Sequence, residues 1–231
     1  MKENHILIGL GGTGGKVLKA FRKRLYQEYN DDERAKLPIA FLYVDSSTEE
    51  MMPGDKTWYV LGKNAQFTAN EFVNVKGVDI KSILANPKNY PGLKGLIGDG
   101  EVMAKTIGEV GAAAAQKRRA GRILFGSSVE NYKNALLGAY NRVNKITHAE
   151  RTNIYIFTGL AGGTGSGSII DVISQTRMMP QFQDMLSMDG KTGTAIVVNA
   201  MVPEITPPGK SDAGMFDANG YAAVQELNDL L

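Results

Sequence analysis

Two glycine-rich segments carry the residues that could do chemistry. Residues 9–15 read Gly-Leu-Gly-Gly-Thr-Gly-Gly, and residues 159–168 read Gly-Leu-Ala-Gly-Gly-Thr-Gly-Ser-Gly-Ser. Each follows an apolar run typical of a buried strand and precedes a helical pattern. Glycine lets a phosphate oxygen approach the backbone closely, and a helix N-terminus offers free N–H groups with a partial positive charge. Together the two segments predict a polyphosphate held from two sides.

The elements around these segments alternate between strand and helix. His5–Leu10 and Pro38–Val44 are apolar runs, and Lys16–Tyr29 between them has its apolar residues near one helical face. This order predicts a doubly wound α/β fold with a mostly parallel sheet and helices on both faces, in which ligands bind at the carboxyl ends of the strands. Further strands are expected at Trp58–Leu61, Asn153–Thr158 and Thr194–Val202, and further helices near Asp79–Leu84, at Ala112–Phe125, Ser128–Ile146, Ser168–Met179 and from about Asp217 to Leu231.

The composition indicates one globular domain. The chain has 231 residues, of which 43% are hydrophobic and 22% charged, so we expect one domain over residues 1–231. The glycine segments make it a nucleotide-binding domain, and the irregular pattern with turn signals around 62–100 predicts a surface insertion. A net charge of +2 is too small to indicate nucleic-acid binding. The absence of cysteine excludes disulfides and thiolate nucleophiles, and His5 and His148 share no ligand spacing, so no metal ligands are predicted. No apolar run is long enough to span a membrane, and we expect a cytoplasmic protein.

Two standard phosphate-binding motifs can be compared with the first glycine segment. Gly9 to Gly14 satisfies G-x-G-x-x-G, the dinucleotide fingerprint, and Asp45 ends the next strand as a ribose-binding acid would. Asp45 lies 31 residues beyond Gly14, where about 20 is usual, and this interpretation leaves the second segment unexplained. The Walker A motif fails because Leu10 stands where its first glycine should be and Val17 replaces its Ser or Thr.

The second segment resembles the signature loop of the tubulin/FtsZ GTPase superfamily, usually written GGGTG[ST]G. Ala161 stands where the first of those glycines usually is, and Gly162-Gly163-Thr164-Gly165-Ser166-Gly167 follows intact. Ile8 to Gly15 is similar to the first glycine loop of the superfamily, although Lys16 stands where the FtsZ branch usually has asparagine. The order of the other elements also fits the superfamily, and the chain resembles its bacterial tubulin-like branch rather than FtsZ itself.

The resemblance implies a bound GTP or GDP with Mg²⁺. It places Asp45 and Ser46 in a second nucleotide loop, Gly111 in a loop at 108–115 that senses the terminal phosphate, and Glu204 in a ribose-contacting loop after the strand Thr194–Val202. The nucleotide-binding residues expected on this basis are Gly11, Gly12, Thr13, Gly14, Gly15, Asp45, Ser46, Gly111, Gly162, Gly163, Thr164, Gly165, Ser166 and Glu204.

The resemblance also implies parts beyond this chain. In the superfamily a long central helix reads the guanine base, and the loop after it donates an acidic residue to the nucleotide of the next subunit. No segment follows Leu231 to do either, so we expect a fragment of a longer protein or a reduced relative, with no catalytic residue assigned. GTP hydrolysis would need a C-terminal part and a neighbouring subunit. Head-to-tail self-association is the expected mode of assembly.

Two other functions remain open from the sequence. A Rossmann-type NAD-dependent oxidoreductase would use the G-x-G-x-x-G segment, and a nucleotide-free scaffold would keep only the fold. The basic cluster Lys117, Arg118, Arg119 and Arg122 is either a solvated helix face or the source of a side chain that reaches the terminal phosphate.

Overall fold

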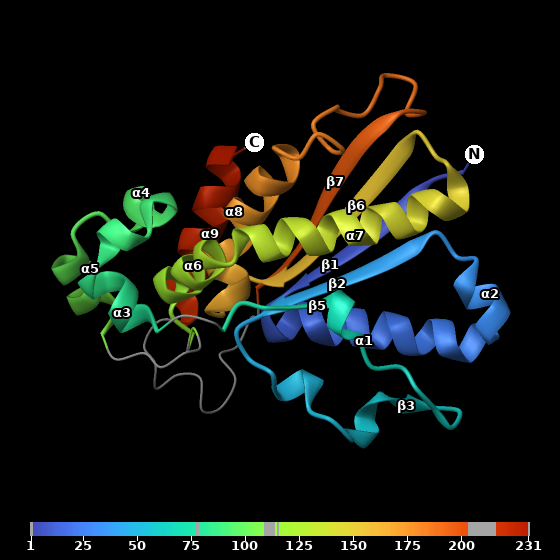
Figure 1. Ribbon diagram of the computed structural model, residues 1–231, viewed down its shortest axis with the longest axis horizontal. Helices are drawn as coiled ribbons and strands as arrows, with labels where there is room; N and C mark the ends of the chain where they lie inside the picture. Colours follow the sequence, from blue (N-terminus) through green and yellow to red (C-terminus); the bar gives the residue numbers. More distant parts are fainter. Residues whose placement is uncertain (1, 77–78, 109–113, 115, 203–215, 231) are drawn as a thin grey trace.

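A five-stranded parallel sheet forms the centre of the protein (Figure 1). The computed structural model describes residues 2–76, 79–108, 114, 116–202 and 216–230. The strand order is β5-β2-β1-β6-β7. The strands are β1 (Asn4–Leu10), β2 (Ile39–Asp45), β5 (Phe72–Asn74), β6 (Arg151–Gly159) and β7 (Gly193–Met201). This architecture confirms the predicted α/β fold with a parallel sheet.

Helices cover both faces of the sheet, because successive residues of each strand point to opposite sides. On one face α1 (Gly11–Glu28) packs its Leu18 with Leu7, Phe41 and Tyr43 of the strands. On the other face Ile6, Ile8 and Leu10 belong to a larger apolar cluster with α6, α7 and α8. Figure 1 shows α7 and α1 on opposite sides of the strands. These helices span Arg118–Ser127 (α6), Val129–Thr147 (α7) and Thr164–Arg177 (α8), and α9 (Phe216–Leu230) lies against α8.

The prediction of a third strand of the main sheet at Trp58–Leu61 is wrong. β3 (Tyr59–Val60) pairs antiparallel with β4 (Lys63–Asn64) in a separate two-stranded ribbon. Leu61 and Gly62 form its turn with positive φ angles of 48° and 76°, which end the strand. The main sheet instead takes β5 as its edge, and its three residues are too short a run to stand out in the sequence.

The segment predicted as an insertion at 62–100 supplies part of the core. It contains β5, α3 (Ile80–Ala85), α4 (Lys94–Ile97) and the start of α5 (Gly100–Ile107). Val73, Val75 and Ile83 are buried in the same cluster as the sheet and α7. The remaining short elements are α2 (Asp31–Ala35) and 3₁₀ turns at Glu49–Met51, Lys56–Trp58, Ala69–Glu71, Pro87–Asn89 and Pro91–Leu93.

Two helices begin earlier than their sequences indicate. The predicted starts were Lys16 and Ser168, whereas α1 begins at Gly11 and α8 at Thr164, inside the glycine segments. Glycine has low helix propensity, so the sequence pattern favours a loop there. Close packing explains the helical glycines: a Cβ on Gly14 would lie 2.3 Å from the Phe157 carbonyl oxygen, and one on Gly167 would lie 2.1 Å from that of Arg118.

Within the described part of the chain, no helix combines the length and apolarity needed to cross a lipid bilayer.

Candidate phosphate-binding site at the carboxyl edge of the sheet

The two glycine segments meet where β1 and β6 end. These strands are parallel neighbours, with Leu10 opposite Thr158, so the helices that follow them start side by side. Gly11 has a φ of 64°, and a Cβ on it would lie 3.0 Å from the Gly165 backbone nitrogen. The fold therefore brings together two segments about 150 residues apart in sequence, because the carboxyl ends of parallel strands share one edge of the sheet.

Both helix starts lack the usual partners for their free N–H groups. The N-cap residues are Leu10 for α1 and Gly163 for α8, and neither forms a side-chain capping hydrogen bond. Neither helix has an acidic residue in its first turn. Free N–H groups and the positive ends of two helix dipoles thus converge on one place, an arrangement suited to binding an anion.

The glycines of the site fall into two groups according to what a side chain would meet. Gly14, Gly15, Gly163 and Gly165 each have another residue within 3.0 Å of a hypothetical Cβ: respectively the Phe157 carbonyl oxygen, the Tyr43 ring, the Ala114 Cβ and the Thr158 hydroxyl. Packing is therefore a sufficient reason for glycine at these four positions. Gly12 and Gly162 differ, because a Cβ on either would have no atom of the described residues within 4 Å. These two positions leave room for a ligand against the backbone, and the sequence could not separate them from the other four.

Ser46 ties the end of β2 to the start of α8. Its Oγ lies 2.8 Å from the Thr164 Oγ1 and accepts a 3.1 Å hydrogen bond from the Ala114 N–H. Ser46 and Thr164 are both buried, whereas Thr13 on α1 is exposed beside Gly159. The structure therefore brings the expected residues of the second nucleotide loop into contact with the glycine segment.

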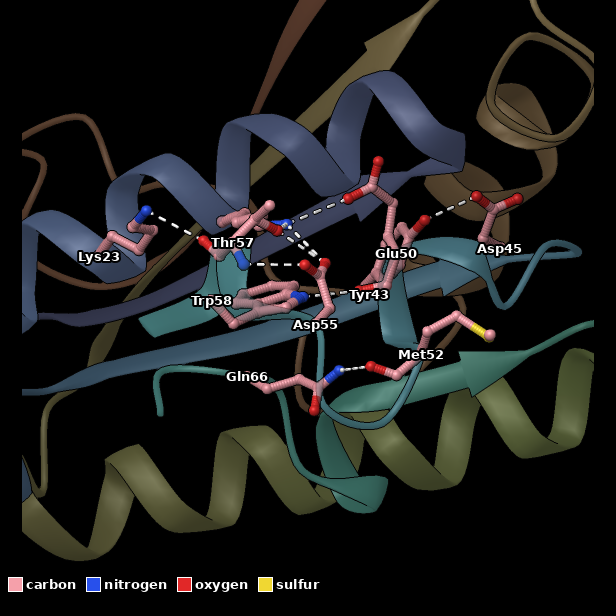
Figure 2. A network of polar contacts seen from close by, with 10 residues as sticks. Lys23, Tyr43, Asp45, Glu50, Met52, Asp55, Thr57, Trp58 and Gln66 are labelled. Carbon is pink, nitrogen blue, oxygen red and sulfur yellow. Dashed lines mark hydrogen bonds and ion pairs between the residues drawn. The ribbon is translucent and has the colours of Figure 1, made fainter. Parts of the chain in front are cut away.

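Asp45 is a buried carboxylate at the same edge. Its Oδ2 accepts a 2.7 Å hydrogen bond from the Tyr43 hydroxyl (Figure 2). Its Oδ1 accepts from the N–H groups of Ser46 at 2.7 Å and Ser47 at 3.3 Å. Burial raises the pKa of Asp45, and the hydrogen bonds, that from Tyr43 foremost, act in the opposite direction. No ion pair to Asp45 is found among the residues that the structure describes. A buried carboxylate without an ion-pair partner is costly when it is ionised. Asp45 is therefore suited to interact with a cation or to accept a hydrogen bond from a sugar hydroxyl.

The side chain of Ser166 is directed elsewhere. Ser166 is fully buried, and its Oγ accepts a 2.7 Å hydrogen bond from Nε of Arg118 on α6. The Arg118 guanidinium also forms an ion pair with Glu226 on α9, and Arg122 forms one with Asp171 at 2.8 Å. Two members of the basic cluster are thus already paired with carboxylates. Gly111 and Glu204 lie outside the described residues.

Tyr43 and Asn219 also contact the site, and neither was predicted from the sequence. Tyr43 stands in a buried strand two residues before Asp45, so both side chains point to the same face, and this spacing could have suggested their hydrogen bond. Asn219 on α9 donates to the carbonyl oxygen of Ala161 in the glycine segment. No local sequence pattern predicts that contact, because the two residues are 58 positions apart in the sequence.

The family model described as "Tubulin like" matches residues 6–230. The chain belongs to the tubulin-like family. This assignment confirms the superfamily resemblance carried by the glycine segment. No curated protein matches the chain significantly.

Two solved structures are similar to the chain at low sequence identity. CetZ1 from Haloferax volcanii, described as a GDP-bound monomer, is 16% identical with a TM-score of 0.49, and the match covers 96% of this chain and 47% of CetZ1. CetZ2 from the same organism, described as a GTPγS-bound protofilament, is 14% identical with a TM-score of 0.43, over 95% of this chain and 56% of CetZ2. The chain spans about half the length of these two structures.

Among the described residues, no group of three or more His, Asp or Glu side chains is arranged to hold a metal ion by itself.

Proposed function

We propose that this chain is the nucleotide-binding part of a tubulin-like GTP-binding protein. The observation that carries the proposal is the meeting of two helix starts without side-chain caps, at which Gly12 and Gly162 leave the backbone open. Backbone N–H groups in the first turns of α1 and α8 would donate to the phosphate oxygens. Membership of the tubulin-like family makes guanine the expected base.

Asp45, Ser46 and Thr164 would organise the side of the site next to β2. The Ser46–Thr164 hydrogen bond fixes the start of α8 relative to β2. Asp45, at the end of β2, would accept a hydrogen bond from a ribose hydroxyl or from water on a cation. Mg²⁺, when bound with the nucleotide, would neutralise phosphate charge. The residues of this chain would bind and orient the phosphates rather than transfer protons.

The direct test is a thermal-shift panel with GTP, GDP, ATP and NAD, each with and without magnesium. A ligand at about 100 times its Kd stabilises by about 2.7 kcal/mol, which is about 5–10 °C for a chain of this size. Shifts with GTP and GDP but not with NAD are expected. A shift with NAD alone would favour the oxidoreductase alternative, and no shift with any nucleotide would favour the scaffold.

Hydrolysis and assembly are proposed for a longer protein. The isolated chain, given GTP and magnesium, is expected to release phosphate no faster than a buffer control. Robust turnover by the 231-residue chain would show that it holds the catalytic groups itself. A protein that includes this chain and the rest of a tubulin-like sequence is expected to sediment as head-to-tail polymers with GTP and to remain in solution with GDP.

A further inference from the structure

The amide side chain of Asn219, on α9, contacts the backbone of the second glycine segment. Nδ2 of Asn219 donates to the Gln116 carbonyl oxygen at 2.7 Å and to the Ala161 carbonyl oxygen at 3.1 Å. Asn219 is only 7% exposed. Three parts of the chain are therefore joined at one nitrogen atom: the loop between β6 and α8, the residues just before α6, and α9.

The contact to Ala161 fixes the residue next to the open position of the loop. On one side of Gly162, Ala161 accepts from Asn219, and Leu160 donates to the Met201 carbonyl oxygen at 3.0 Å. On the other side, a Cβ on Gly163 would lie 2.9 Å from the Gln116 nitrogen. Between these anchors, a Cβ on Gly162 would have no atom within 4 Å in the part of the chain that the structure describes. The direction in which its backbone faces is therefore set by its neighbours.

The contact to Gln116 holds a strained residue. Gln116 has a φ of 63°, in the left-handed region that residues other than glycine seldom adopt. Such a conformation persists only where the surroundings determine it. The hydrogen bond from Asn219 to its carbonyl oxygen is one such determinant, and the Lys117 N–H bond to the Ala114 carbonyl oxygen at 2.8 Å is another.

A second side chain of α9 supports the same segment two turns later. Glu226, seven residues after Asn219 and so near the same helical face, pairs with Arg118 at 2.6 Å. Arg118 in turn donates to the Oγ and to the carbonyl oxygen of Ser166 in the first turn of α8. The helix α9 thus contacts the phosphate segment on both sides of Gly162, directly through Asn219 and through Arg118.

We propose that Asn219 is a positioning residue that holds the backbone around Gly162 in the conformation that receives phosphate. This inference rests on the proposed nucleotide-binding function. Both acceptors are carbonyl oxygens, so the position requires a group with two N–H donors, which the carboxamide supplies. A carboxylate of the same shape would direct oxygen against two oxygens and repel the loop.

The test compares Asn219→Asp with Asn228→Asp, which adds the same charge to an exposed position of the same helix. At pH 8 we expect Asn219→Asp to weaken GDP binding about 10-fold and Asn228→Asp to change it less than twofold. Lowering the pH towards 5 protonates the introduced buried acid, which can then donate one hydrogen bond. As the pH is lowered from 8 towards 5, the ratio of variant to wild-type Kd should therefore decrease for Asn219→Asp and stay constant for Asn228→Asp.

Hydrogen exchange without ligand separates this proposal from the nucleotide proposal. In Asn219→Asp the amides of residues 160–164 should exchange about 10-fold faster than in the wild type, while those of β1 stay unchanged. If the wild type binds no nucleotide, the function fails, and this exchange measurement still decides the role of Asn219. A folded Asn219→Asp with wild-type GDP affinity, or with exchange accelerated uniformly, would overturn the positioning role. Should that variant not fold, Asn219→Leu removes the donors without a charge and takes its place in both measurements.

Discussion

At the residue scale, Gly12 and Gly162 can be separated from their neighbours by substitution. Alanine at either position would meet no atom of the described residues within 4 Å, and neither glycine is among those with a positive φ, so Gly12→Ala and Gly162→Ala should keep the fold. The loss of glycine entropy in the unfolded chain is worth about 0.4–1 kcal/mol, so Tm should be unchanged or rise by roughly 1–4 °C. The added methyl group occupies space needed by phosphate, and GDP affinity should fall at least 10-fold by calorimetry.

Two control variants complete that comparison. Gly138→Ala changes an equally open glycine in α7, remote from the site, and should leave GDP binding unaltered. Gly14→Ala would place its Cβ 2.3 Å from the Phe157 carbonyl oxygen and should lower Tm strongly. Normal GDP affinity in both Gly12→Ala and Gly162→Ala would contradict the placement of phosphate between these helix starts.

The ionised carboxylate of Asp45 should lower the stability of the ligand-free fold while it supports nucleotide binding. Burial raises its folded-state pKa above the ordinary value of 3.8. The folded state therefore holds the proton more tightly than the unfolded state, and the free energy of unfolding falls as pH rises from about 3.8 through the folded-state pKa. Above that pH interval the carboxylate is ionised in both the folded and the unfolded state, and the decrease in the free energy of unfolding is complete. Asp45→Asn should thus raise the Tm of the ligand-free chain at pH 7–8, by roughly 2–4 °C for each kcal/mol recovered, and weaken magnesium-dependent GDP binding.

The pH dependence supplies the control for Asp45. The Tm advantage of Asp45→Asn should shrink as pH falls towards 4, because the wild-type acid then becomes neutral. Asp55 has its pKa lowered, mainly by hydrogen bonds from Thr57, so Asp55→Asn should give no such advantage. A Tm for Asp45→Asn below that of the wild type at pH 8 would show that the ionised carboxylate stabilises the ligand-free fold.

At the element scale, one lysine fastens the segment after β2 to α1. Lys19 Nζ lies 3.4 Å from Glu50 and 3.3 Å from Asp55, donates to Thr57, and stands 4.5 Å from the centre of the Trp58 ring. Trp58 in turn donates from Nε1 to the Glu50 carbonyl oxygen at 2.8 Å (Figure 2). The segment 49–58 follows directly on the Asp45–Ser47 loop, so this network limits how far the loop can move.

Removing that lysine should loosen the segment measurably. Lys19→Met leaves two carboxylates without their cation. We expect the free energy of unfolding to fall by about 1 kcal/mol, or Tm by roughly 2–4 °C, and the Trp58 fluorescence to shift to longer wavelength as the ring becomes more exposed to solvent. Lys16→Met is the matched control, because Lys16 is exposed one turn earlier on α1. Equal Tm values for the two variants, with unchanged emission, would show that the network contributes nothing to holding the segment.

The elements also show what the sequence can and cannot predict. Long apolar runs predicted β1, β2, β6 and β7 within about two residues. In β1 and β2 the reason is burial on both faces of a parallel sheet, which leaves a continuous apolar signal. The edge strand β7 shows the same apolar run although none of its residues is fully buried. β5 was missed since three residues carry little pattern, and Trp58–Leu61 was placed in the wrong sheet since an apolar run does not specify its pairing partner. At the site, the glycine segments were visible as motifs. Which glycines face open space, and which residue supports them from α9, depends on contacts between distant elements.

At the scale of the whole molecule, the two apolar clusters share one sheet. Along β1, Ile6 and Ile8 belong to the cluster with α6, α7 and α8, while Leu7 between them belongs to the cluster with α1 and Trp58. Neither cluster can come apart while the other keeps the strand in place, so unfolding should be a single cooperative transition. Trp58 is the only tryptophan and is 1% exposed, so its fluorescence reports the α1 side, while far-UV circular dichroism reports all helices. The two signals should give the same urea midpoint, and saturating GDP should raise both midpoints equally. A fluorescence midpoint well below the dichroism midpoint would contradict this, because it would show the α1 side opening while the opposite face stays folded.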